Sequence, residues 1–177
     1  MDGSVHILEI TMIERLAKIT LVAAVALYFA VVALNNVTDY GSNLAFVQHV
    51  LAMDTTFPGN KLSWRGLTSP SVHHVFYAGI ILWEAVSALV IGLGAVQLWR
   101  ERRSSAPAFN AAKSAAIGAL AFSLLLWFTA FLTVGGEWFV MWQSHTWNGQ
   151  DAAFRMFGCI ALILLFLKTP DTELPMA

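Results

Sequence analysis

The sequence of 177 residues has few charged side chains, five prolines and a single cysteine. Asp, Glu, Lys and Arg make up 12% of it, whereas about a quarter of an average soluble domain is charged. So few charges cannot cover the water-facing surface of a chain of this size, which excludes a soluble monomer. The lone Cys159 excludes a disulfide within the chain, and we expect it to be a small buried residue. A net charge of −1 provides no basic surface for nucleic acid, so we expect no nucleic-acid partner.

Apolar residues are abundant instead, at 58% of the chain, with seven Trp and twelve Phe. The mean hydropathy is +0.66. A helix that spans a bilayer needs about 20 mostly apolar residues. The sequence has four such segments, at about 13–34, 74–99, 114–134 and 152–167. We therefore predict an all-α, polytopic membrane protein over residues 1–177, with the lipid bilayer around one four-transmembrane-helix bundle.

Basic residues beside the spans predict the orientation of the chain, because Lys and Arg accumulate on the cytoplasmic side. One side carries Arg15, Lys18, Arg100, Arg102, Arg103, Lys113 and Lys168. The other side has Lys61, Arg65 and Arg155 at the edge of the fourth span. We therefore expect both termini to be cytoplasmic and the loops 35–73 and 135–151 to lie outside.

A short helix is predicted in the first outer loop. Within Asn43–Met53, apolar residues recur at helical spacing, with Ser42 or Asn43 as the expected N-cap. Such an amphipathic segment is typical of a helix that lies at the membrane interface. Further along the loop, Ser69 and Pro70 predict the start of the second span, because proline favours the first turn of a helix.

The two outer loops mix Trp, His and Arg with turn residues, a composition that favours an ordered cap over a passive tether. Trp138, Trp142 and Trp147 gather beyond the third span. They fit either an aromatic belt at the lipid headgroups or the wall of a ligand or partner pocket. The candidate residues for ligand or partner binding in this cap are His49, Asp54, Trp64, Arg65, His73, His74, Glu137, Trp138, Trp142, His145, Trp147 and Arg155.

Glu84 is the candidate polar site within the membrane. It lies about ten residues into the second span, roughly 15 Å below its outer end. A carboxylate at that depth costs several kcal/mol unless it is protonated or paired. The residue type fits a proton relay, a cation ligand or a contact with a partner subunit. It equally fits a protonated structural group bonded to a Ser, Thr or Trp.

A metal site in the outer loops has weaker support. The candidate ligands are His49, His73, His74, His145 and Glu137, which are chemically suited to zinc or copper. No pair has the close spacing of known metal motifs, and adjacent residues such as His73 and His74 point about 100° apart on a helix. No histidine lies inside a span, which disfavours a haem held by two histidines. The cofactor therefore stays unassigned.

The sequence contains no visible catalytic motif, so no catalytic residue is assigned and we lean against an enzyme. Arg155 is better explained structurally. We expect it to pair with Asp151 one turn earlier, or with Glu137 across the outer surface.

Three long stretches carry a family resemblance: NNVTDYGSNLAFVQHVLAMDTTFPGN, WRGLTSPSVHH and GGEWFVMWQSHTWNGQDAAFR. They resemble the bacterial family described as predicted small integral membrane protein (domain of unknown function 2165). The resemblance runs from about Met12 to Asp171. It implies a small multi-pass protein of the bacterial cytoplasmic membrane, and it implies no activity, substrate or cofactor. Residues 1–11 resemble an extension, which makes both Met1 and Met12 candidate starts.

Three functions are therefore open, in this order. The first is an accessory or binding subunit of a larger membrane assembly, for which the Trp/His-rich cap is the docking surface. The second is a small transporter or proton-coupled permease that assembles as a homo-oligomer around Glu84. The third is a metal or redox protein that uses the outer histidines.

Overall fold

The computed structural model describes residues 3–173, with side chains from Thr11 onward; Met1 lies outside this range. Its long helices are α1 (Gly3–Thr38), α3 (Pro70–Glu101), α4 (Ala106–Leu125) and α5 (Gln150–Lys168). The shorter elements are α2 (Tyr40–Ala52), η1 (Ser63–Arg65), η2 (Leu126–Trp138) and η3 (Met141–Gln143). Residues 3–173 contain no strand. Four helical stretches are long and apolar enough to span a membrane, namely Thr11–Thr38, Pro70–Glu101, Ala106–Trp138 and Gln150–Lys168, which confirms the predicted all-helical, four-span class.

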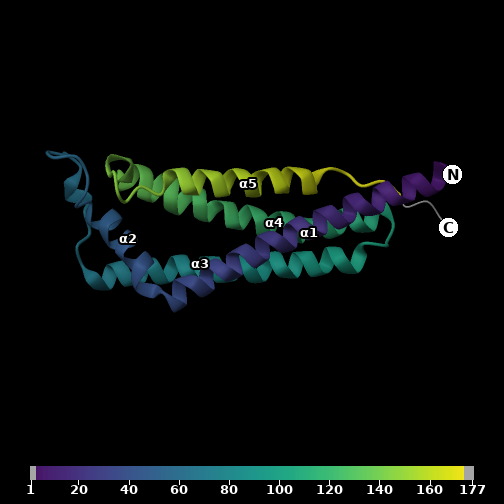
Figure 1. The fold of residues 1–177 in the computed structure, drawn as a ribbon, viewed down its shortest axis with the longest axis horizontal. Coiled ribbons are helices and arrows are strands. Elements are labelled where there is room, and N and C mark those ends of the chain that lie inside the picture. Colours follow the sequence, from purple (N-terminus) through teal and green to yellow (C-terminus); the bar gives the residue numbers. More distant parts are fainter. Residues whose placement is uncertain (1–2, 174–177) are drawn as a thin grey trace.

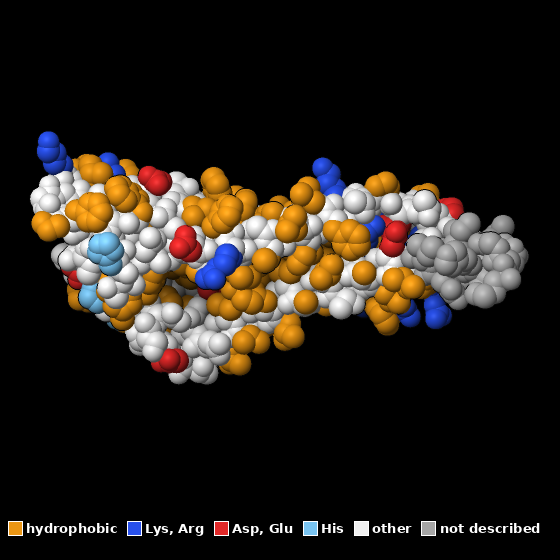
Figure 2. All heavy atoms as spheres, turned by 45° about the horizontal axis from the view of Figure 1, so that its top comes forward, with side chains coloured by type: hydrophobic (Ala, Val, Ile, Leu, Met, Phe, Trp, Pro, Cys, Tyr) orange, Lys and Arg blue, Asp and Glu red, His pale blue; other side chains and the backbone are white. Residues whose placement is uncertain are grey.

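The four spans form a long bundle in which α1 packs along α3, α3 along α4, and α5 along α4 and η2 (Figure 1). The start of α1, the end of α5 and the turn between α3 and α4 lie at one end, which we call the terminal end. The opposite end, which we call the cap end, holds α2 and the loops beside it. Hydrophobic side chains are spread along the bundle surface, as a lipid-facing surface requires (Figure 2).

The predicted helix in the first long loop is present, but it begins earlier than expected. Asp39 occupies the N-cap position of α2, so the expectation of Ser42 or Asn43 is wrong. The reason is that α1 continues to Thr38 and the chain re-enters a helix after one residue. Val47 and Val50 are buried against the bundle, so α2 closes the end of the bundle. At the start of α3, Pro70 lies in the first turn after Ser69, as predicted.

The end of the third span is a wide π-helix, which the sequence pattern did not reveal. The Phe139 N–H donates to the carbonyl of Val134 at 2.9 Å, and the Thr133 hydroxyl donates to the carbonyl of Phe128 at 2.9 Å. The backbone bond from Phe139 to Val134 spans five residues, the spacing of a π-helix, and the Thr133 bond comes from its side chain. Long π-helical stretches are rare and occur often at functional sites, so this segment draws attention to the space beside it.

Two small residues allow the closest approach between helices. A Cβ atom added at Gly94 of α3 would lie 2.9 Å from the Cα atom of Ala116 in α4. Gly79, on the same helix, has no atom within 4 Å of such a Cβ.

The single cysteine departs from its expected place, because Cys159 is exposed on α5 and faces away from the neighbouring helices.

The terminal end is held by buried charges, which include basic residues that the sequence analysis had used only to predict the orientation of the chain. Asp171, after the end of α5, accepts from Lys18 Nζ of α1 at 2.6 Å and also pairs with Lys113 of α4. All three side chains are buried. The peptide carbonyl of Thr169 accepts from both lysines, at 3.0 and 2.7 Å. The last described residues therefore fold back and join α1, α4 and α5.

Arg15 completes this network, which we call the Asp171 cluster. Its guanidinium is fully buried and donates to the carbonyls of Arg102, Ser104 and Thr172, at 2.7–3.1 Å. It also lies 4.7 Å from the centre of the Phe109 ring. A buried cation needs such partners, because burial removes its water.

Replacing Asp171 with Asn is expected to destabilise the bundle, because two buried lysines lose their counter-charge. The expected loss is about 3–5 kcal/mol of unfolding free energy. The loss should appear in size-exclusion chromatography of heated samples, as a lower temperature at which the monodisperse peak disappears. Glu14→Gln, which changes an exposed carboxylate on α1, is the control and should leave that temperature unchanged.

Gly94→Ala and Gly79→Ala are expected to have opposite effects in the same thermal assay. The added methyl group of Gly94→Ala meets the α4 backbone and should cost about 1–3 kcal/mol. The same change at Gly79 meets nothing, and should be neutral or stabilising by about 0.5–1 kcal/mol through helix propensity. Equal effects at both positions would contradict the close helix contact.

Candidate functional site

The two long loops are joined into one ordered cap, as their composition predicted. The Leu67 N–H donates to the carbonyl of Leu51, at 2.8 Å. Across the loops, the Thr55 hydroxyl donates to Ser144 Oγ at 2.8 Å, and the Phe57 N–H donates to Gln143 Oε1 at 3.1 Å. Beneath these bonds lies a hydrophobic cluster of Val47, Val50, Leu51, Met53, Tyr77, Phe139, Val140 and Met141.

The candidate histidines gather at the cap end (Figure 2), but they share no common site, because three of them have separate partners. His49 pairs with Asp54 at 2.8 Å and stacks on the ring of Trp147. His73 is buried and donates from Nε2 to the carbonyl of Leu67 at 2.6 Å. His74 Nδ1 shares a hydrogen bond of 2.9 Å with the Tyr40 hydroxyl, and His145 and Glu137 are exposed. Among the side chains of residues 11–173, no three His, Cys, Asp or Glu residues lie together as metal ligands would.

The candidate tryptophans divide into separate contacts. Arg65 lies over the ring of Trp138, 4.5 Å from its centre, and Trp64 meets the same ring edge-on. The exposed Trp142 contacts the ring of Phe57. Trp147 turns inward and packs against Phe46 and His49. The cap therefore presents exposed aromatic rings and keeps one beneath α2.

Arg155 does not form the predicted ion pair. The ion pairs between described side chains are Lys18–Asp171, Lys113–Asp171 and His49–Asp54. Arg155, Asp151 and Glu137 are all exposed. Exposed pairs contribute little free energy, so nothing holds these side chains together.

Glu84 is buried and bonded to an amide, which differs from the expected Ser, Thr or Trp partner. Asn36 of α1 donates from Nδ2 to Glu84 Oε2 at 2.7 Å, and Asn43 of α2 donates to Asn36 Oδ1 at 2.6 Å. The Tyr77 hydroxyl donates to the peptide carbonyl of Asn36 at 3.2 Å. Glu84 forms no ion pair with any side chain of residues 11–173. The amides of Asn43 and Asn36 thus form two consecutive hydrogen bonds, and the second ends on a carboxylate that has no cation beside it.

This carboxylate opens onto a cavity of about 260 Å³, which we call the Glu84 cavity. Its mouth lies between α1, α2 and α5, where Asn43 and Ala152 are exposed. The indole N–H of Trp127, which also lines it, is buried and has no partner among the described residues. The lining residues are Val32, Asn36, Asn43, Phe46, Val47, Tyr77, Ile80, Glu84, Trp127, Phe131, Gly149, Ala152 and Ala153.

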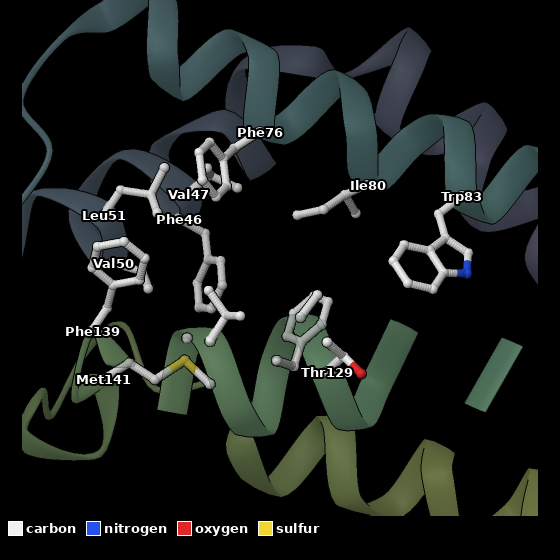
Figure 3. Close-up of a pocket in the computed structure, with 14 residues that line it drawn as sticks. Phe46, Val47, Val50, Leu51, Phe76, Ile80, Trp83, Thr129, Phe139 and Met141 are labelled. Carbon is white, nitrogen blue, oxygen red and sulfur yellow. The ribbon is translucent and has the colours of Figure 1, made fainter. Parts of the chain in front are cut away.

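A second cavity of about 210 Å³, which we call the apolar cavity, lies beside the Glu84 cavity and shares lining residues with it. Figure 3 shows Phe46 and Ile80 pointing into this space from α2 and α3. Phe76 of α3 and Thr129 of η2 are exposed at its edge, so it opens on the side of the bundle. It is lined by Phe46, Val47, Val50, Leu51, Phe76, Ile80, Trp83, Thr129, Ala130, Phe131, Val134, Gly135, Phe139 and Met141.

The wall between the cavities consists of Phe46, Val47, Ile80 and Phe131, which line both. The rings of Phe46 and Phe131 lie 6.3 Å apart and nearly parallel. Of these cavity residues, the sequence indicated only Glu84 as a polar site. Asn36 and Asn43 belong to no binding-site motif. The one sequence feature that could have indicated this site is an amide side chain next to an apolar run.

Comparison with family models finds a match over residues 14–170, to the family described as "Predicted small integral membrane protein (DUF2165)". This match covers most of the chain. The searches of curated proteins and of solved structures gave no match.

Asn36→Ala is expected to destabilise the protein by about 1–3 kcal/mol, because the Glu84 carboxylate loses its donor while it stays buried. Asn35→Ala is the matched control, since the Asn35 side chain is exposed and only its backbone carbonyl accepts hydrogen bonds. Thermal unfolding of the two variants in the same detergent tests this. A loss for both variants, or for neither, would contradict the assignment of Asn36.

Proposed function

The chain belongs to the family of predicted small integral membrane proteins, and from this starting point we propose that it is a binding subunit of the membrane. It takes a small amphipathic molecule from the bilayer into the space beneath the cap. The polar part of that molecule lies in the Glu84 cavity, and the apolar part continues past the Phe46–Phe131 wall.

One observation carries this proposal: two cavities of different polarity meet at a shared wall. The Glu84 cavity has a carboxylate and two amides, whereas the apolar cavity has a single hydroxyl, that of Thr129. Small-molecule sites combine apolar walls with a few polar groups in this way. The mouth of the apolar cavity, between Phe76 and Thr129, lies on the side of the bundle, which favours a ligand that arrives through lipid.

The cap supports a role as an accessory subunit of a larger assembly. Trp64, Trp138 and Trp142 are exposed on its surface, and Trp64 is 71% exposed. Aromatic residues beside an arginine are common in the centres of protein interfaces. The proposal puts this face outside a bacterial cytoplasmic membrane, with both termini inside. Arg100, Arg103 and Lys168, which are exposed at the terminal end, support this orientation.

Transport coupled to Glu84 is a second candidate, and the position of the carboxylate on a cavity favours it. Intramembrane carboxylates mark ion and proton pathways in many membrane proteins. A bundle of four spans would have to associate with further copies to form such a pathway. The separate contacts of the histidines give a redox or metal role no comparable support.

Native mass spectrometry of gently extracted protein tests the proposal, with Ala152→Phe as the variant. Ala152 lines the Glu84 cavity at its mouth, so a ring there takes up space that the ligand needs, whichever way it enters. Wild type should retain the mass of a small molecule, and Ala152→Phe should lose most of it. Ala121→Phe adds the same ring to an exposed position of α4 and is the control.

Retention of the same small-molecule mass by Ala152→Phe would contradict binding in this cavity. An added protein subunit in the spectrum supports the accessory role. A chain or homo-oligomer without an added subunit contradicts that part of the proposal and leaves transport as the next function to measure.

A further inference from the structure

We propose that the polar part of the ligand is an organic cation, a substituted ammonium group that lies between the Glu84 carboxylate and the aromatic rings of the Glu84 cavity. This inference rests on the proposed function, because it names the class of molecule that the same cavity takes.

Two carboxylates are buried among the described side chains, and they differ in their counter-charges. Asp171 is paired with Lys18 and Lys113, so the chain itself provides its counter-charge. Glu84 is equally buried, and no described Lys, Arg or His pairs with it. The Asn43–Asn36 donors replace part of its lost water, but they carry no net charge. A cation in the cavity supplies the counter-charge that Glu84 lacks.

The rings decide what kind of cation fits. Tyr77, Trp127, Phe131 and Phe46 line the cavity together with Glu84, and the rings of Trp127 and Phe131 lie 5.1 Å apart. Aromatic rings attract ammonium groups, and substituted ammonium ligands are recognised by such aromatic surroundings. A metal cation requires several oxygen or nitrogen ligands instead. No cluster of three such acidic, histidine or cysteine side chains exists between residues 11 and 173.

The size of the cavity agrees with this class. A buried apolar cavity of about 150 Å³ holds one benzene molecule. The Glu84 cavity, at about 260 Å³, leaves room for a ring and a small charged group. Phenyltrimethylammonium has this composition, and tert-butylbenzene has the same shape without the charge. The pair therefore separates the contribution of charge from that of fit.

The experiment measures binding of both probes to the full-length protein in lipid nanodiscs, by isothermal titration calorimetry. Each probe is compared between wild type and Glu84→Gln, because the two probes partition differently into lipid. Gln retains an acceptor for the Asn36 amide and removes the charge. Glu84→Gln should weaken phenyltrimethylammonium about tenfold or more and change tert-butylbenzene less than about twofold.

Two further variants keep the result interpretable. Asp39→Asn removes an exposed carboxylate near the cap end and should leave both affinities unchanged, which excludes a general effect of net charge. Trp127→Leu keeps Glu84 and removes a ring of the cavity. It should weaken the cation about threefold or more relative to the neutral probe, and it serves if Glu84→Gln does not fold.

The outcomes separate this inference from the proposed function. Binding of both probes with no dependence on Glu84 or Trp127 would overturn the inference and leave ligand binding in place. Binding of neither probe to wild type would overturn both. Selective loss of the cation in Glu84→Gln and Trp127→Leu, with Asp39→Asn unchanged, supports both.

Discussion

The whole bundle depends on the buried ion pairs at Asp171. One carboxylate joins Lys18 of α1 to Lys113 of α4, and the chain around it follows the end of α5. Buried charges of this kind are costly to separate, because each would be left without water or partner. The terminal end is therefore closed. The helices diverge toward the cap end, where α2 and aromatic side chains enter between them and both cavities lie.

In the proposed function, the two carboxylates that are buried in the described part of the chain have separate roles, one in the fold and one in binding. Asp171 has its counter-charges within the chain, because it forms ion pairs with the buried Lys18 and Lys113. Glu84 has amide donors on one side and a cavity on the other. A buried carboxylate whose charge is paired within its own chain stabilises the fold. A buried carboxylate without a counter-charge is instead available for a ligand, and such groups in membranes are typically functional.

The sequence predicted what depends on local pattern. Four apolar runs, a short helix near Asn43 and the start of α3 at Pro70 were all readable from spacing and composition. The burial of Lys18 and Lys113 was not, because it depends on residues 169–173 folding back across the bundle. The Asn36–Glu84 bond likewise depends on the register of α1 against α3, which no local pattern specifies. The π-helical turn spacing after Leu126 carries no known sequence signal, and it positions Trp127 and Phe131 on the cavities.

In the proposed function, the mouth between Phe76 and Thr129 has a consequence for how the occupancy of the cavity by ligand is controlled. A molecule that enters through the side of the bundle equilibrates with the bilayer and not directly with the aqueous phase. Its occupancy then follows its mole fraction in the membrane, so a ligand that partitions strongly needs only a weak intrinsic affinity to fill the site. Adding lipid at a constant total amount of ligand lowers the mole fraction of the ligand in the membrane, so the occupancy of the cavity falls. Such a site reports on the composition of the bilayer around it.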